Sequence, residues 1–238
     1  MPLERILQSQ GFGSRKACRE LIEAGRVAVN GQPCRQPGMA LVADESLILQ
    51  VDDTPWPWRA AVYLALYKPA GVECSHQPQH HRSVFSLLPA HFVARGVQCA
   101  GRLDADTTGL LLMSDDGAWL HALASPKRHV PKTYRVSCRH PLDEAMLQAL
   151  RNGVMLHDES QPLAALHCEQ AGERQLILTI DQGKYHQVKR MVAAAGNRVE
   201  GLHREAVGAL QLGTGELAEL AEGSWHMLSD MALAALRG

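Results

Sequence analysis

Residues 100–117 read AGRLDADTTGLLLMSDDG, a stretch in which a short apolar run stands between acidic residues. The run, Leu110–Met113, is flanked by turn-forming residues and is typical of a buried β-strand. Two carboxylates precede it and two follow it, at Asp104, Asp106, Asp115 and Asp116. Carboxylates avoid the interior unless another group pairs with them. The pattern therefore predicts that the acids before the strand are functional or paired, and that those after it lie in a solvated turn.

Outside this stretch, strand and helix patterns alternate without a regular βαβ rhythm. Strand-like segments occupy 62–67, 132–139 and 175–181, and helical periodicity covers 141–150 and 185–195. The chain has 238 residues and 46% hydrophobic residues, enough for a sizeable core and for two domains.

The first fifty residues have the pattern of a separate small module. LERILQSQ is expected to form a short helix that ends before Gly11, and Ser14 is expected to cap a second helix. A short strand should follow at 26–29, with a tight hairpin turn at Asn30-Gly31 and a further strand at 47–51.

The stretch GFGSRKACRELIEAGRVAVNG resembles the αL-motif RNA-binding domain of ribosomal protein S4 and of many RNA-modifying enzymes. The resemblance covers about a fifth of the chain, and the alternative is an ordinary helical hairpin. It implies that Arg15, Lys16 and Arg19 contact backbone phosphates, which position a protein on RNA without reading its sequence.

Charge is unevenly distributed along the chain. The net charge of −1 is unusual for a protein that coats nucleic acid through its average field, so an RNA site must be a local patch. Residues 117–142 contain five basic residues and no acid: Lys127, Arg128, Lys132, Arg135 and Arg139. A solvated surface would also account for this run.

Residues 53–60 are expected to link an N-terminal domain, 1–52, to a larger domain, 61–238. Two prolines and paired acids in this segment suit neither a helix nor a central strand. Trp56 and Trp58 are expected to dock the linker onto the neighbouring domain rather than to stack on bases.

Three uses are open for Asp104 and Asp106 when they are considered alone. They are a metal-binding Asp-x-Asp, as in sugar-nucleotide transferases, a nucleophile or base, and the capping of the turn that leads into the strand.

Four motifs together resemble the RsuA family of ribosomal RNA pseudouridine synthases. They are YKPAGVECS, GRLDADTTGLLLMSDDG, PKTYRV and GKYHQVKRM, and they stand in the family's order over most of residues 61–210. KYHQVKRM is more similar to the small-subunit branch of the family than to its large-subunit relatives. The expected fold is α+β, with an αL-motif domain followed by a catalytic domain that has a mixed, largely antiparallel sheet and flanking helices.

The resemblance implies that Asp104 is the catalytic carboxylate, that Lys189 is its cationic partner with Arg190 as the fallback, and that Tyr134 stacks on the target base. It also implies that Arg102 contacts the extruded nucleotide. Further RNA contacts are expected at Arg190 and from two basic clusters, Arg15, Lys16 and Arg19 near the N-terminus and Lys127, Arg128 and Lys132 in residues 117–142. Pseudouridine formation cleaves the N-glycosidic bond of a uridine and rejoins the base through carbon, so no cofactor is expected, and the chain has neither an ATP-binding loop nor a dinucleotide fingerprint.

Two features depart from a simple match to the family. Asp181-Gln182-Gly183 stands where the family commonly has Glu before the glycine, which puts any role of that glutamate in doubt. Cys74, His76, His80 and His81 fit no standard zinc spacing, so no metal site is expected.

The expected function is the isomerisation of a uridine in small-subunit rRNA, within an assembling small ribosomal subunit. A large-subunit rRNA synthase, a metal-dependent glycosyl transferase and a non-catalytic rRNA-binding assembly factor remain alternatives. No apolar run approaches the roughly 18 residues of a membrane span, and the six cysteines are widely spaced. We therefore expect a cytoplasmic protein with reduced thiols, no membrane partner and a monomeric state.

Overall fold

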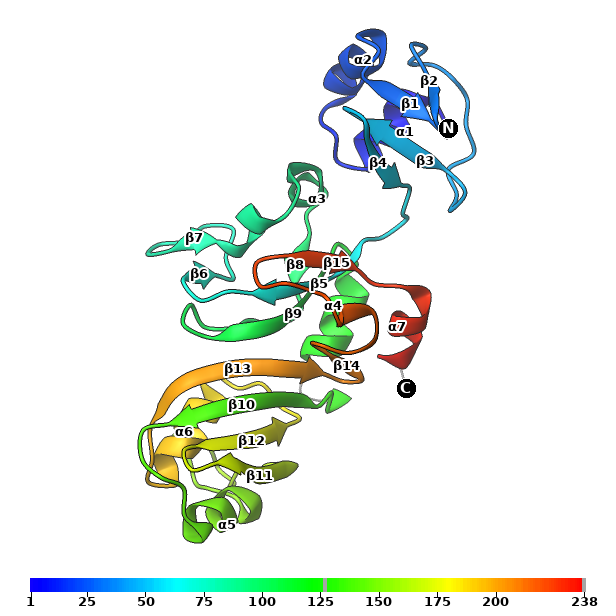
Figure 1. The fold of residues 1–238 in the computed structure, drawn as a ribbon. Helices are drawn as coiled ribbons and strands as arrows, with labels where there is room; N and C mark the ends of the chain where they lie inside the picture. The colour runs from blue at the N-terminus through cyan, green and yellow to red at the C-terminus, as the bar shows by residue number, and fades with distance from the viewer. Residues whose placement is uncertain (126–127, 237–238) are drawn as a thin grey trace. The chain divides into compact units, whose positions relative to one another are not determined.

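The structure is a computed structural model that describes residues 1–125 and 128–236, and the chain forms two compact units (Figure 1). The first unit contains residues 1–62 together with 88–98 and 114–116. The second contains 63–87, 99–113 and the chain from 117 onward. In the described residues, no helix is long and apolar enough to cross a membrane.

The first unit packs helices against a four-stranded antiparallel sheet of order β2-β1-β3-β4. The Ser14 hydroxyl caps α2 by accepting a hydrogen bond from the amide of Ala17 at 3.2 Å, as predicted. Asn30 and Gly31 have φ values of 48° and 79° and form the predicted hairpin turn. The elements of the unit are α1 (Leu3–Ser9), α2 (Arg15–Glu23), β1 (Val27–Val29), β2 (Gln32–Pro33), β3 (Ile48–Val51), β4 (Thr54–Pro57) and α3 (Ala90–Ala94).

The segment expected to be a linker contains a strand instead. Thr54–Pro57 forms β4, which pairs with β3 at the edge of the sheet. Proline is tolerated in an edge strand because its missing N–H can face away from the ladder, so Pro55 and Pro57 do not prevent the pairing. Trp56 contacts the rings of His91 and Phe92 in α3, with centroid distances of 4.2 and 5.8 Å, so it packs against protein.

The second unit is built on a nine-stranded sheet whose main path runs β11-β12-β10-β13-β9-β5-β15. The pairings of β10 with β12 and β13 are antiparallel, whereas β13 and β9 are parallel, as expected for a mixed sheet. The strands of this sheet are β5 (Tyr63–Lys68), β8 (Gln98–Cys99), β9 (Thr108–Ser114), β10 (Lys132–Cys138), β11 (His167–Gly172), β12 (Gln175–Ile180), β13 (Val199–Val207), β14 (Leu210–Gln211) and β15 (Trp225–Met227). The second unit also has a separate two-stranded sheet of β6 (Val72–Glu73) and β7 (Arg82–Ser83). Its helices are η1 (Val84–Leu87), α4 (Gly117–Ala124), α5 (Glu144–Asn152), α6 (Gln187–Ala194), η3 (Gly215–Leu217) and α7 (Asp230–Ala235).

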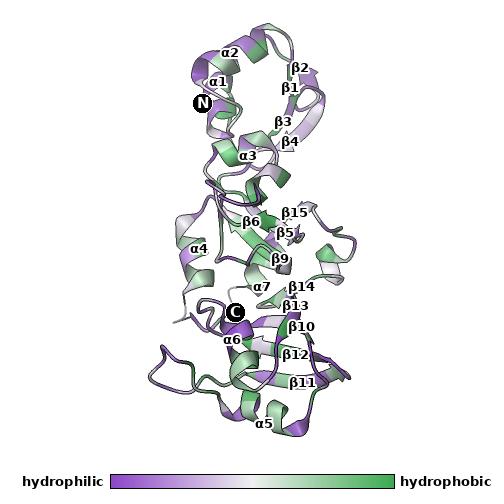
Figure 2. Ribbon diagram, turned by 90° about the vertical axis from the view of Figure 1, so that its left-hand side faces the viewer, coloured by the Kyte–Doolittle hydropathy of each residue, from purple (hydrophilic) through white to green (hydrophobic). Residues whose placement is uncertain are grey.

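Strand β9 is the predicted buried strand and lies inside the sheet of the second unit. Leu110, Leu111, Leu112 and Met113 are at most 1% exposed, and Figure 2 shows the hydrophobic colour that runs along β9. Near its start, Gly109 has a φ of 111° and a Cβ there would lie 2.2 Å from the carbonyl oxygen of Arg204. The glycine therefore allows β13 to approach β9 closely.

The prediction that the acids after this strand lie in a solvated turn is wrong for Asp115. Its carboxylate is 2.7 Å from Nε of Arg95, and both side chains are mostly buried within the first unit. Asp115 also accepts a hydrogen bond from the amide of Val62 at 2.7 Å. Arg95, 20 residues earlier in the chain, pairs with this carboxylate, so the charge of Asp115 does not need to be solvated by water.

Lys132, expected as an RNA contact in a basic cluster, is not on an exposed face of β10. It is 7% exposed and shares the buried face with Tyr134, Val136 and Cys138. These residues are two apart, and the period-2 geometry of a strand places them on one side.

Candidate active site

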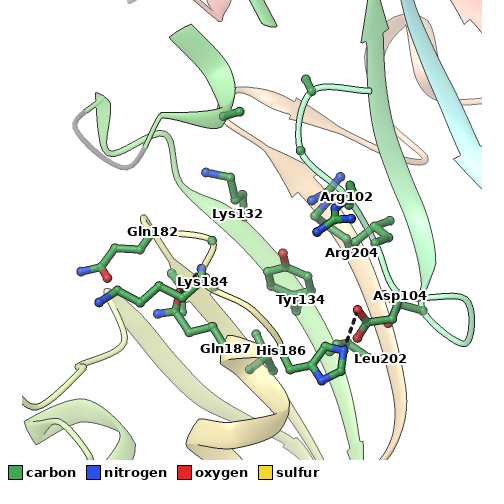
Figure 3. Close-up of a pocket in the computed structure, with 18 residues that line it drawn as sticks. Arg102, Asp104, Lys132, Tyr134, Gln182, Lys184, His186, Gln187, Leu202 and Arg204 are labelled. Atoms are coloured by element: carbon green, nitrogen blue, oxygen red, sulfur yellow. Dashed lines mark hydrogen bonds and ion pairs between the residues drawn. The ribbon is translucent and has the colours of Figure 1, made fainter. Parts of the chain in front are cut away.

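A pocket in the second unit gathers the loop before β9, the strands β10 and β13, and the segment that leads into α6 (Figure 3). Its lining includes Arg102 and Asp104 from the loop, Tyr134 from β10, Arg204 from β13 and His186 from the start of α6. These residues are distant in sequence, and the pairing of β10 with β13 and of β13 with β9 brings them together.

Asp104 has a basic side chain within 3.2 Å of each of its two oxygens. Oδ2 is 2.9 Å from Nζ of Lys189, and Oδ1 is 3.2 Å from Nε2 of His186. The carboxylate is 31% exposed, so it sits at the wall of the pocket and can be reached from solvent. His186 has a φ of 48°, a left-handed conformation that is unfavourable for a residue with a Cβ, and such strain is concentrated at functional sites.

Lys189 also holds the second aspartate of the motif. Its Nζ lies 2.7 and 2.9 Å from the two oxygens of Asp106, which is 72% exposed. Burial alone would lower the pKa of Lys189, but its hydrogen bonds to Asp106 and Asp104 raise that pKa above the ordinary value. An ammonium group thus lies between the two carboxylates, at the position that a metal-binding Asp-x-Asp would give to a divalent cation.

Lys68 anchors the loop that carries both aspartates. It is fully buried at the end of β5 and donates hydrogen bonds to the carbonyls of Pro69, Ala105 and Thr107, at 3.0, 3.3 and 2.8 Å. Burial lowers the pKa of this lysine. A buried ammonium that binds three carbonyls fixes the backbone on both sides of Asp106.

The wall opposite the loop carries Tyr134, Lys132 and Arg204. Tyr134 is 7% exposed and is paired in register with Arg204, so the two side chains lie on one face of the sheet. Burial and the charge of Arg204 lower the pKa of Lys132 to about 8, and its Nζ donates to the carbonyl of Val130 at 2.8 Å. The pocket therefore combines an aromatic ring with one carboxylate and two buried cations.

The residues predicted to contact RNA are placed in different surroundings. Arg102 and Arg128 are exposed, whereas Arg190 is paired with Asp158. Lys127 lies outside the described residues. Lys132 faces the pocket rather than an open surface.

In the first unit, Arg15 and Arg19 form ion pairs with the two oxygens of Glu4, at 2.5 and 3.0 Å. Both arginine side chains remain 52% exposed, while Glu4 is 3% exposed. Lys16 is exposed on the same helix. A buried carboxylate thus orients two guanidinium groups at the surface.

Two members of the site were not singled out by the sequence: Lys68 and Arg204. Lys68 stands in the quoted motif YKPAGVECS, and a lysine at the end of an apolar strand was a usable signal for a buried cation. His186, three residues before the predicted lysine in GKYHQVKRM, belongs with Lys189 and Arg190 to a basic trio near the start of the expected helix. Arg204 follows Leu202 and His203 in β13, and no local pattern marks it as buried.

Gln182 replaces the glutamate that the family commonly has. Figure 3 shows its side chain directed away from Tyr134. Its Oε1 is buried without a hydrogen-bond partner among the described residues. The preceding residue, Asp181, lies 2.6 Å from Nδ1 of His129. The departure from the family pattern therefore lies in the lining of the same pocket, with its side chain directed away from Tyr134.

Comparisons with known proteins identify the family to which this chain is similar. The family model described as RNA pseudouridylate synthase matches residues 62–194, and the S4 domain model matches residues 1–46. Ribosomal small subunit pseudouridine synthase A of Pasteurella multocida (strain Pm70) is 36% identical over 98% of both chains. The protein of the same name from Vibrio vulnificus (strain CMCP6) is 39% identical, over 89% of this chain and 91% of the relative.

A solved structure is similar over nearly the whole chain. A crystal structure of a pseudouridylate synthase superposes with a TM-score of 0.68 and 32% identity, and covers 99% of each chain. The family model alone spans more than half of the sequence, and it contains the loop of Asp104, the strand of Tyr134 and the helix of Lys189. The chain therefore belongs to the RNA pseudouridylate synthase family, as a pseudouridine synthase with an N-terminal S4 domain.

Proposed function

We propose that this enzyme isomerises one uridine of small-subunit ribosomal RNA to pseudouridine. The names of the relatives that match most of the chain support the choice of the small subunit. The observation that carries the chemistry is the placement of Asp104 at the pocket wall, between Lys189 at 2.9 Å and His186 at 3.2 Å.

Asp104 is the proposed catalytic carboxylate. It acts at the sugar of the target nucleotide when the C1′–N1 bond breaks. The ammonium of Lys189 stabilises the negative charge of the carboxylate by direct attraction, and Lys68 holds the loop from behind through the carbonyls of Ala105 and Thr107. This arrangement keeps the carboxylate in place while the base turns.

Base flipping is a second part of the proposal. A uridine inside structured RNA does not reach a pocket wall unless its nucleotide leaves the stack, at a cost of a few kcal/mol. The ring of Tyr134 offers a stacking surface in the pocket, and stacking on an aromatic ring is a common way to hold an unpaired base. Exposed Arg102 at the pocket and the arginines of α2 would contribute backbone contacts that offset this cost.

The proposed partner is rRNA within an assembling small subunit, where the target nucleotide is still accessible, and the enzyme acts there as a cytoplasmic monomer. Two RNA-facing regions on one chain support binding of an extended RNA surface, since the S4 domain precedes the catalytic domain.

Pseudouridine mapping of rRNA from cells with and without this gene tests the proposal. We expect one pseudouridine of the small-subunit rRNA to disappear on deletion and to return when the wild-type protein is expressed. Expression of Asp104→Asn should leave the site unmodified. An unchanged map would contradict the proposal and favour a non-catalytic assembly factor, and loss of a large-subunit site would correct the choice of target.

A further inference from the structure

Arg204 is a buried cation with an unused donor in the pocket. The residue is 3% exposed, and its Nε donates to the carbonyl of Leu110 at 2.7 Å. Its Nη2 is buried with no hydrogen-bond partner among the residues that the structure describes. An arginine side chain stays charged in proteins, and a buried charged donor without a partner is costly.

The unused donor faces the place where a base would stack. Arg204 and Tyr134 are register partners on β13 and β10, and Figure 3 shows the guanidinium beside the hydroxyl end of the tyrosine ring. Asp104 and Asp106, the acids of the loop before β9, are bound by Lys189 and His186. The guanidinium is therefore left for a ligand with an oxygen acceptor.

A nucleotide offers two kinds of acceptor to an arginine, the phosphate oxygens and the carbonyl oxygens of the base, and the burial of Arg204 decides between them. Phosphates belong to the RNA backbone and stay at the pocket rim, where Arg102 is exposed. Only the base and part of the sugar can reach a residue that is 3% exposed. Nη2 is covered by its neighbours, so rim side chains must move when the nucleotide enters, as is common on binding.

We propose that Arg204 donates from Nη2 to a carbonyl oxygen of the target uracil and stabilises the charge of the departing base. When the C1′–N1 bond breaks, its electron pair stays on the base, and the negative charge spreads from N1 onto O2 and O4. After rotation, C5 bonds to C1′, the C5 proton is lost and N1 gains a proton, so the reaction is a net isomerisation.

This assignment rests on the proposed function and adds a catalytic residue to it. A fixed donor aimed at charge that develops during the reaction lowers the barrier more than it strengthens ground-state binding. Removal of one such donor typically costs roughly 100- to 1000-fold in rate. The expected defect of an Arg204 variant is therefore in the chemical step.

The test compares Arg204→Gln and Arg204→Lys with wild type on small-subunit rRNA transcribed with uridine tritiated at C5. Release of tritium under single-turnover conditions with saturating enzyme reports the reaction. Arg174→Gln removes an exposed positive charge from the β11–β12 turn and is the matched control. We expect Arg204→Gln to be slower by roughly 100-fold with an RNA Kd close to that of wild type, Arg204→Lys to fall between, and the control to match wild type.

A second substrate separates catalysis from a structural defect. In rRNA transcribed with 5-fluorouridine, the fluorine stabilises the anionic base, so cleavage of its glycosidic bond should depend less on Arg204. Loss of 5-fluorouridine is measured by chromatography of the digested RNA. The defect of Arg204→Gln should be clearly smaller on this substrate, whereas a misfolded pocket would slow both substrates equally.

Either of two results overturns the inference: an Arg204→Gln rate close to wild type, or an equal defect on both substrates. If the wild-type enzyme itself releases no tritium from small-subunit rRNA, either alone or within an assembling small subunit, the proposed function fails first.

Discussion

At the scale of single residues, Lys189 is the group on which both aspartates of the loop converge. Its bond to Asp104 lies at the pocket wall, while Asp106 is 72% exposed. Exposed ion pairs contribute little because water and salt screen them. The two contacts of one lysine should therefore differ in their importance for the reaction.

Lys189→Met should lower the single-turnover rate by roughly 100-fold or more, because the charged carboxylate of Asp104 loses its nearest cation. Asp106→Asn should change the rate by less than about fivefold, because its contact is screened. Tritium release at saturating enzyme measures both, and Lys189→Arg should recover part of the rate. Equal losses of rate for Lys189→Met and Asp106→Asn would show that Lys189 acts mainly by holding the loop.

The pocket should also respond to pH through Lys132. Burial and the charge of Arg204 lower its pKa to about 8, and Asp181 opposes this shift only in part. The side chain is therefore a cation below pH 8 and becomes neutral above it. Since a lysine cation attracts RNA and a neutral amine does not, the affinity for RNA should fall as the pH rises through 8.

Lys132→Arg provides the control for this pH dependence, because arginine keeps its charge throughout the range. The Kd of the wild type and of this variant is measured between pH 7 and pH 9 at constant ionic strength. The wild-type Kd should rise a few-fold across this range, and that of the variant should stay nearly flat. A parallel rise in both proteins would assign the pH dependence to another group.

At the scale of elements, the close approach of β9 and β13 places Arg204 in the pocket. Gly109 makes this approach possible: its φ is 111°, and a Cβ would meet backbone atoms of Arg204 at 2.2 and 2.6 Å. Neither atom belongs to a flexible side chain, so the strands themselves must move to admit a methyl group.

Gly109→Ala should lower the free energy of unfolding by at least about 2 kcal/mol, from backbone strain and the clash with β13. Gly117→Ala is the matched control, because no atom lies within 4 Å of a Cβ at that position. Urea unfolding curves of both variants measure the change. Similar unfolding midpoints would mean that β13 can shift without loss of stability.

The sequence predicts elements well where the signal is local. The cap at Ser14, the hairpin turn at Asn30-Gly31 and the buried run Leu110–Met113 depend on neighbours within a few residues, and the structure confirms each. The burial of Asp115 depends on Arg95, which belongs to another element. A sequence does not specify such pairs until the packing of the elements is known.

The same limit applies to the site. Asp104, Tyr134 and Lys189 were predicted from family motifs, and the structure places the first two in one pocket, with Lys189 bound to Asp104. Lys68 and Arg204 were missed because their partners are carbonyl groups from distant segments. A buried arginine resembles a surface arginine when only its neighbours in sequence are considered.

At the scale of the whole molecule, the S4 domain is expected to contribute to RNA affinity and the catalytic unit to the reaction rate. Arg15 and Arg19 are exposed and oriented by Glu4, and they are suited to phosphates. Phosphate contacts contribute affinity and salt dependence without acting on the reacting bond. The S4 domain should therefore affect binding, and the pocket should affect the rate.

Arg19→Ala should raise the RNA Kd several-fold and reduce the slope of log Kd against log salt by about 1. The rate at saturating enzyme should not change. Arg35→Ala removes an equal charge from a side chain that donates to the carbonyl of Glu23, and should have a smaller effect. Filter binding at several salt concentrations measures the slope, and equal slopes for the two variants would place the RNA contact elsewhere on this unit.

The most direct test of the whole account is the rate of Asp104→Asn. Asparagine has nearly the same shape as aspartate but no negative charge, so RNA binding and folding should be retained. The rate of tritium release from small-subunit rRNA is measured at saturating enzyme beside the RNA Kd and the circular dichroism spectrum. The account predicts no product above background with a near-normal Kd; conversion at the wild-type rate would contradict it.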